Sequence, residues 1–182
     1  MTAPNIVSLL RILLVPLAIW LIIADRTQAA FFVFVTAGVS DAVDGFMAKR
    51  FGLQSELGAY LDPLADKLLL VSIYVALGVL GDLPSWLVIL VVSRDVLIVA
   101  ALMISFMLGH PLRIRPLMIS KLNTAVQIGL AAATLADSGF VLGLGTLVQG
   151  LVYLTALLTG LSAAAYLRAW LTHMAGGGEG AA

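Results

Sequence analysis

Four aspartates in strongly apolar sequence are the residues best suited to chemistry in this chain. Asp41 and Asp44 are spaced i, i+3, and Asp62 and Asp66 are spaced i, i+4. On a helix, either spacing places both side chains on one face. A carboxylate at the centre of a membrane helix costs roughly 2.5–3.5 kcal/mol even on a mild insertion scale. Because carboxylates this close do not all stay ionised without a counter-cation, the pattern predicts a bound cation.

Hard divalent cations suit such a set because they prefer oxygen ligands. Four carboxylates are appropriate for one or two Mg²⁺, Mn²⁺ or Ca²⁺ ions. Two metal ions held in this way neutralise a phosphate and stabilise the attacking and leaving oxygens of a displacement at phosphorus. The chain has no cysteine, which excludes a thiolate metal site. The residues therefore predict metal-dependent phosphoryl chemistry.

Small residues accompany the aspartates. Gly45 and Ala48 lie on the same predicted helix face as the first pair, and Gly58 lies one turn before the second pair. Small side chains leave open volume beside the carboxylates, and they also permit close helix contact. A helix-packing motif would account for the glycines, but it would not account for four acids.

The elements that position these residues are predicted to be membrane helices. The chain of 182 residues is 62% hydrophobic and 11% charged, with a mean hydropathy of +1.10. This composition predicts an integral membrane protein. A spanning helix needs about 20 mostly apolar residues. Six stretches meet that need, at residues 5–24, 28–49, 58–80, 84–108, 117–136 and 143–171.

The predicted architecture is all-α: a polytopic membrane protein with six transmembrane helices in one domain, residues 1–174. Gly- and Pro-containing segments separate the stretches, and Asp137–Ser138–Gly139 is the last of these predicted turns. The Gly-rich tail, 175–182, has nothing to bury and is predicted to be disordered. The formal net charge is zero, which gives no reason to expect a nucleic-acid partner.

Loop charges predict the orientation. Basic residues concentrate on the side of the N-terminus, at Lys49, Arg50, Arg113, Arg115 and Arg168. The positive-inside rule then places both termini in the cytoplasm. The acidic run is expected near the cytoplasmic face, and we expect the membrane to be the cytoplasmic membrane of a bacterium.

The acidic run also resembles a known signature. From Asp41 to Asp66 it matches every spacing of the CDP-alcohol phosphatidyltransferase motif, D-x₂-D-G-x₂-A-R-x₈-G-x₃-D-x₃-D, with Lys49 in place of the arginine. Lysine keeps the charge but loses the guanidinium fork. The resemblance implies a homodimer in which all four aspartates hold Mg²⁺ or Mn²⁺ and Asp66 is the general base. It further implies that one set of residues binds the CDP-linked donor: Asp41, Asp44, Gly45, Ala48, Lys49, Gly58 and Asp62.

Two further segments, 93–98 and 116–127, are similar to cardiolipin synthases of the CDP-diacylglycerol-dependent type. In the implied reaction, a glycerol hydroxyl of phosphatidylglycerol attacks the phosphatidyl phosphorus of CDP-diacylglycerol, and CMP leaves. Phosphatidylglycerophosphate synthases share segment 4–11 and the acidic run, so glycerol 3-phosphate is the alternative acceptor. A cation-coupled transporter is a more distant alternative, because intramembrane acids also mark ion paths. A non-catalytic scaffold is another.

Four residues are candidates for binding the acceptor lipid: Arg11, Arg94, Lys121 and Asn123. Lys121 could be an interfacial snorkelling lysine, but we favour a site for an anionic head group, because an intramembrane cation is a functional hypothesis by default. Arg94 and Asp95 could form a buried structural pair with polar partners on other helices, or they could support the acidic site. Arg11 could meet a lipid phosphate or pair with an acid.

Overall fold

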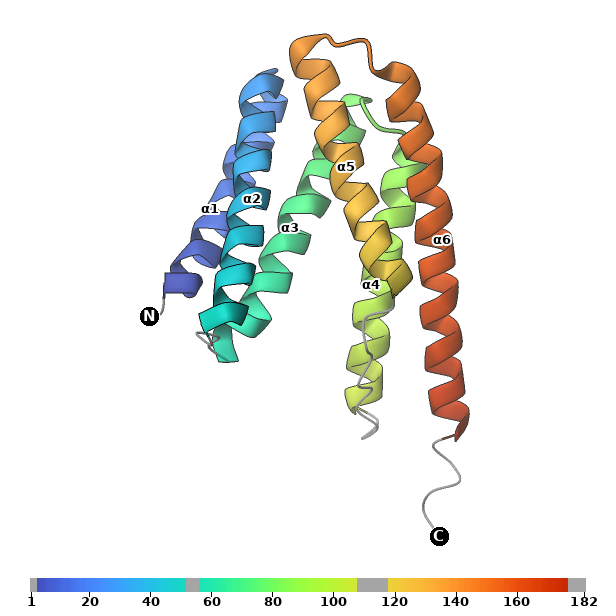
Figure 1. The fold of residues 1–182 in the computed structure, drawn as a ribbon. Helices are drawn as coiled ribbons and strands as arrows, with labels where there is room; N and C mark the ends of the chain where they lie inside the picture. The colour runs from blue at the N-terminus through green and yellow to red at the C-terminus, as the bar shows by residue number, and fades with distance from the viewer. Residues whose placement is uncertain (1–2, 52–55, 108–117, 177–182) are drawn as a thin grey trace. The chain divides into compact units, whose positions relative to one another are not determined.

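Six α-helices make up the residues that the structure, a computed structural model, describes (Figure 1). It describes the backbone at 3–51, 56–107 and 118–176, and side chains at 13–40, 67–101, 103 and 118–172. The helices are α1 (Ala3–Ile23), α2 (Thr27–Phe51), α3 (Glu56–Leu80), α4 (Ser85–Met107), α5 (Met118–Phe140) and α6 (Gly145–Gly176). These residues contain no strand. The all-α class is confirmed, and each predicted apolar stretch corresponds to one helix.

The chain divides into two compact units. Unit 1 comprises residues 1–84 and 131–148, and unit 2 comprises residues 85–130 and 149–182. Unit 1 therefore contains α1, α2, α3 and the C-terminal half of α5. Unit 2 contains α4, the N-terminal half of α5 and most of α6.

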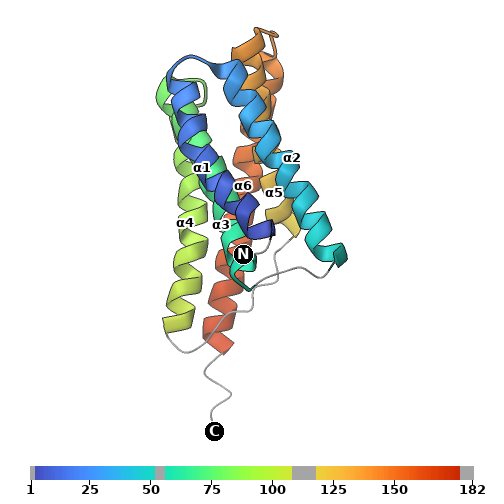
Figure 2. The same cartoon turned by 90° about the vertical axis from the view of Figure 1, so that its left-hand side faces the viewer.

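In unit 1, α1 packs against both α2 and α3 (Figures 1 and 2). The α2 helix runs opposite to α1, whereas α3 runs in the same direction. Buried residues of these helices include Ala18, Ile22, Ala30, Ala37, Ile73 and Leu77. The alanines of α1 and α2 permit a close approach of helix backbones. The C-terminal half of α2 and the N-terminal half of α3 lie toward the same end of unit 1, and these halves carry the aspartates.

Three turns lie at the opposite end of unit 1, around residues 24–26, 81–84 and 141–144 (Figures 1 and 2). The first two contain residues with positive φ, Asp25 at 57° and Gly81 at 88°. Aspartate and glycine are the residue types that adopt this conformation at low steric cost. These two turns lie at the gaps between the predicted apolar stretches, which end at residues 24 and 80.

The third turn is not where the sequence predicted it. Residues 137–139 were expected to form the turn, but α5 continues to Phe140. The Asp137 carbonyl accepts a hydrogen bond from Val141 N at 2.8 Å, and its carboxylate accepts one from Leu144 N at 2.8 Å. Asp137 therefore stabilises the end of α5 and the chain that follows it. The chain reverses at Val141 (φ 53°) and Gly143 (φ 71°).

Gly139 is a packing residue inside α5, not a turn residue. A Cβ atom at this position would lie 2.9 Å from Gln28 N and 3.1 Å from Gln28 Cα. The end of α5 thus approaches the backbone at the start of α2 more closely than any residue with a side chain would allow.

In unit 2, the polar side chains of α4, α5 and α6 converge, as described below. Within the described residues, one stretch, 145–172 of α6, is long and apolar enough by itself to cross a membrane. The α6 helix continues to Gly176, two residues past the predicted end of the domain. The rest of the predicted tail lies outside the described residues.

Candidate functional site

The acidic run occupies two helices of unit 1. Asp41 and Asp44 lie in α2, and Asp62 and Asp66 lie in α3. Since both segments are helical, each spacing places its two residues on one face of the helix. The side chains of residues 41–66 lie outside the described ones, as does the side chain of Arg11. The predicted roles of Gly45, Ala48, Lys49 and Gly58 therefore stay predictions, together with those of the aspartates.

The donor set of this run fits a hard divalent cation. Two carboxylate pairs, each on one helix face and both at the same end of unit 1, offer only oxygen ligands. Among the residues whose side chains are described, no group of three His, Asp or Glu lies close enough to hold a metal ion.

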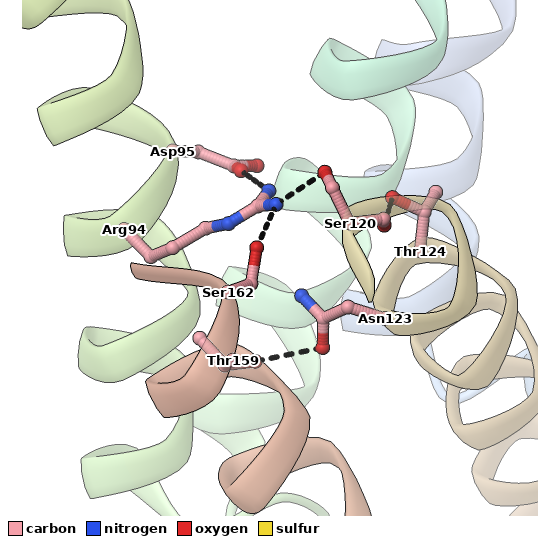
Figure 3. A network of polar contacts seen from close by, with 7 residues as sticks. All are labelled: Arg94, Asp95, Ser120, Asn123, Thr124, Thr159 and Ser162. Carbon is pink, nitrogen blue, oxygen red and sulfur yellow. Dashed lines mark hydrogen bonds and ion pairs between the residues drawn. The ribbon is translucent and has the colours of Figure 1, made fainter. Parts of the chain in front are cut away.

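The polar side chains that the structure brings together surround Arg94 of α4 (Figure 3). Its side chain is only 3% exposed. Nη1 donates to Asp95 Oδ1 at 2.6 Å, and Nη2 donates to Ser120 Oγ and to Ser162 Oγ, each at 2.6 Å. The guanidinium carbon also lies 5.7 Å from the ring centre of Tyr166. One cation thereby links α4 to α5 through Ser120 and to α6 through Ser162.

A second contact joins α5 to α6 one turn away. Thr159 Oγ1 donates to Asn123 Oδ1 at 3.0 Å, and both residues are fully buried (Figure 3). Thr124 Oγ1 donates to the Ser120 carbonyl at 3.1 Å, within α5. We call the residues Arg94, Asp95, Ser120, Asn123, Thr159 and Ser162 the Arg94 cluster.

The composition of this cluster follows from the cost of burying polar groups. A buried charge is tolerated when it is paired and hydrogen-bonded, and Arg94 has both a carboxylate and two hydroxyl partners. Helices in an apolar medium gain association energy from hydrogen bonds of this kind and from small residues at their contacts. The cluster can therefore hold three helices of unit 2 together.

The four predicted acceptor-binding residues have different outcomes. Arg94 and Asn123 lie together in the Arg94 cluster, whereas Lys121 is exposed on another face of α5. Arg11 lies outside the described side chains. The partners Ser120, Thr159 and Ser162 were missed from the sequence. For Thr159 and Ser162 the signal was their spacing with Thr155, which places three hydroxyls on one face of α6.

The sequence was compared with known protein families and proteins. Residues 1–171 match the family model described as CDP-alcohol phosphatidyltransferase. The human cardiolipin synthase (CMP-forming) is 38% identical over 181 residues, which cover 91% of this chain and 60% of the relative. The rat cardiolipin synthase (CMP-forming) is 37% identical over 181 residues, which again cover 91% of this chain and 60% of the relative.

A relative named for a different activity is also similar. The chloroplastic CDP-diacylglycerol–glycerol-3-phosphate 3-phosphatidyltransferase 1 of Oryza sativa is 36% identical over 154 residues, which cover 75% of this chain and 47% of that protein. The chain thus spans about 60% of the length of the human and rat relatives and about half of the rice one.

Proposed function

The chain belongs to the CDP-alcohol phosphatidyltransferase family, and on this premise we propose that it transfers a phosphatidyl group from CDP-diacylglycerol to phosphatidylglycerol. The products are cardiolipin and CMP. The observation that carries the choice of acceptor is the similarity to a cardiolipin synthase over 91% of the chain, against 75% for the relative named for glycerol 3-phosphate.

The chemistry is assigned to the acidic run. Asp66 takes the proton from the free hydroxyl of the phosphatidylglycerol head group. That oxygen then forms a bond to the phosphorus of the phosphatidyl group, and the bond from this phosphorus to the bridging oxygen of CMP breaks. CMP leaves with the electron pair. Gly45 and Ala48 leave room for the cytidine nucleotide.

Asp41, Asp44, Asp62 and Asp66 are the residues that would hold the divalent cations. When bound, Mg²⁺ or Mn²⁺ supplies positive charge that neutralises the two phosphates of the donor. Lys49 adds a further cation beside the donor. The helical register of α2 and α3 supports this assignment, because it places each aspartate pair on one face.

We place all six helices across a membrane. The shortest, α1, has 21 residues, which at 1.5 Å per residue gives about 31 Å, close to the roughly 30 Å of a bilayer core. Large apolar side chains point outward along the helices, such as Leu13 (66% exposed), Phe32 (60%) and Val79 (80%). Water-soluble surfaces rarely carry so many such side chains, whereas lipid tails cover them.

We also propose that both termini are cytoplasmic and that the membrane is the bacterial cytoplasmic one. A homodimer is proposed from the family resemblance.

The acceptor is tested with the purified protein, CDP-diacylglycerol and Mn²⁺ or Mg²⁺. Phosphatidylglycerol and glycerol 3-phosphate are supplied in separate reactions, and the lipid product and CMP are both measured. We expect cardiolipin and an equal amount of CMP from phosphatidylglycerol. Consumption of glycerol 3-phosphate without cardiolipin formation would instead establish the second candidate, a phosphatidylglycerophosphate synthase, which the similarity to the rice protein favours.

The metal requirement is tested in the same assay. A chelator is expected to abolish CMP release, and added Mn²⁺ or Mg²⁺ is expected to restore it. Turnover that continues at full rate after complete metal removal would contradict the assignment of the aspartates as ligands.

A further inference from the structure

Lys121 and the Arg94 cluster occupy the same two turns of α5 but different sides of it. Ser120 and Asn123 are three residues apart and make buried contacts with α4 and α6. Lys121 follows Ser120 directly and is exposed. Successive helix residues are rotated by about 100°, so contacts at positions 120 and 123 fix the direction in which residue 121 points.

Arg94 is poorly placed to bind a lipid head group itself. Its side chain is 3% exposed, and both terminal nitrogens already donate to protein oxygens at 2.6 Å. Lys121 has the opposite properties: it is an exposed ammonium on a flexible stem, which suits contact with an anionic head group.

We propose that Arg94 is a positioning residue of the acceptor site. Through Ser120 it fixes the rotation of α5 about its own axis, and this rotation presents Lys121 to the phosphate of the acceptor. This inference rests on the proposed function and on the sequence-based prediction that Lys121 contacts the acceptor.

The cluster provides a matched pair of variants. Ser120 and Ser162 accept from the same Arg94 nitrogen at the same distance of 2.6 Å, but Ser120 lies on α5 and Ser162 lies on α6. Ser120→Ala removes the link from Arg94 to the helix that carries Lys121. Ser162→Ala removes an equivalent hydrogen bond and leaves that link intact. A purely structural role predicts the same behaviour for both variants.

The kinetic test measures KM for the acceptor, KM for CDP-diacylglycerol, and kcat. We expect Ser120→Ala to raise the acceptor KM by about tenfold, since small displacements of a positioning group have large effects, while the donor KM stays unchanged. Arg94→Lys, which keeps the charge and loses the fork, should show the same split. Ser162→Ala should leave the acceptor KM unchanged. Equal acceptor KM values for the two serine variants would overturn the inference.

A second measurement does not depend on activity. The chain has no cysteine, so Lys121→Cys introduces a single site for a spin label. We expect Ser120→Ala to increase the mobility of a label at position 121 and Ser162→Ala to leave it unchanged. An unchanged spectrum in both backgrounds would also overturn the inference. If the wild type uses glycerol 3-phosphate, the proposed acceptor is wrong, but the same KM comparison with that acceptor still tests the role of Arg94.

Discussion

Arg94 is neutralised by the residue next to it in the chain, Asp95. The sequence predicted a buried pair with polar partners on other helices as one of two readings. The structure supplies those partners as Ser120 and Ser162. Sequence alone could not select them, because a serine or threonine in a membrane helix can satisfy its own hydroxyl by bonding to the carbonyl four residues earlier. Ser40 does this with Thr36, at 2.7 Å.

Removing one charge of this pair should cost more than removing both. Arg94→Met removes the cation that donates to Asp95 at 2.6 Å, and breaking a buried pair in this way costs about 3–5 kcal/mol. The double variant Arg94→Met/Asp95→Leu removes both charges of this pair and should recover part of that loss. Unfolding in detergent of the wild type, both single variants and the double variant gives the coupling energy. Strictly additive losses would contradict a coupled pair.

Asp66 is the proposed general base, and its role can be tested by removing its ability to take a proton. Asp66→Asn keeps the shape of the side chain but cannot take a proton, so we expect CMP release to fall by about 10²–10⁴-fold. Asp25→Asn is the matched control, because Asp25 is exposed in a turn at φ 57° and asparagine tolerates that conformation. The control should keep wild-type activity. An active Asp66→Asn variant would exclude Asp66 as the base.

At the scale of elements, hydropathy predicted all six helices, because runs of about 20 apolar residues leave few alternatives. It failed at the end of α5, where Asp137, Ser138 and Gly139 are residue types typical of turns. The actual turn begins at Val141, a residue type that rarely adopts positive φ. Two contacts explain the difference: Asp137 stabilises the turn from inside the helix, and Gly139 is needed at the contact with α2. The contact of Gly139 with Gln28 joins residues that are far apart in the sequence, so it could not be predicted from the local pattern.

The contact between α5 and α2 can be tested by adding one methyl group. Gly139→Ala would place a Cβ 2.9 Å from Gln28 N, a backbone atom that cannot rotate away. We expect a loss of about 1–3 kcal/mol in unfolding free energy, the usual cost of overpacking. Gly129→Ala on the same helix is the control, because a Cβ there has nothing within 4 Å. Alanine is the better helix former, so the control should be neutral or up to about 1 kcal/mol more stable. Equal effects would refute a close approach at Gly139.

At the scale of the whole molecule, the two ends of unit 1 carry different features, and this matters for the orientation of the protein in a membrane. The turns around residues 24–26, 81–84 and 141–144 lie at one end of this unit, and the helix segments that carry the four aspartates lie at the other. Orientation in a membrane therefore decides which face the acidic run meets. The basic residues Lys49 and Arg50, at the end of α2, favour the cytoplasmic face for that end.

Cysteine labelling tests this orientation, because the natural sequence has no cysteine to interfere. Asp82 is exposed in the turn after α3, and we expect Asp82→Cys to react with a membrane-impermeant maleimide in intact cells. Arg113→Cys, in the basic segment between α4 and α5, should react only after the cells are permeabilised. The reverse pattern would place the acidic run on the outer face, away from the cytoplasm. Reaction of both variants in intact cells would instead contradict the six-span arrangement, because in that arrangement α4 crosses the membrane between these two positions.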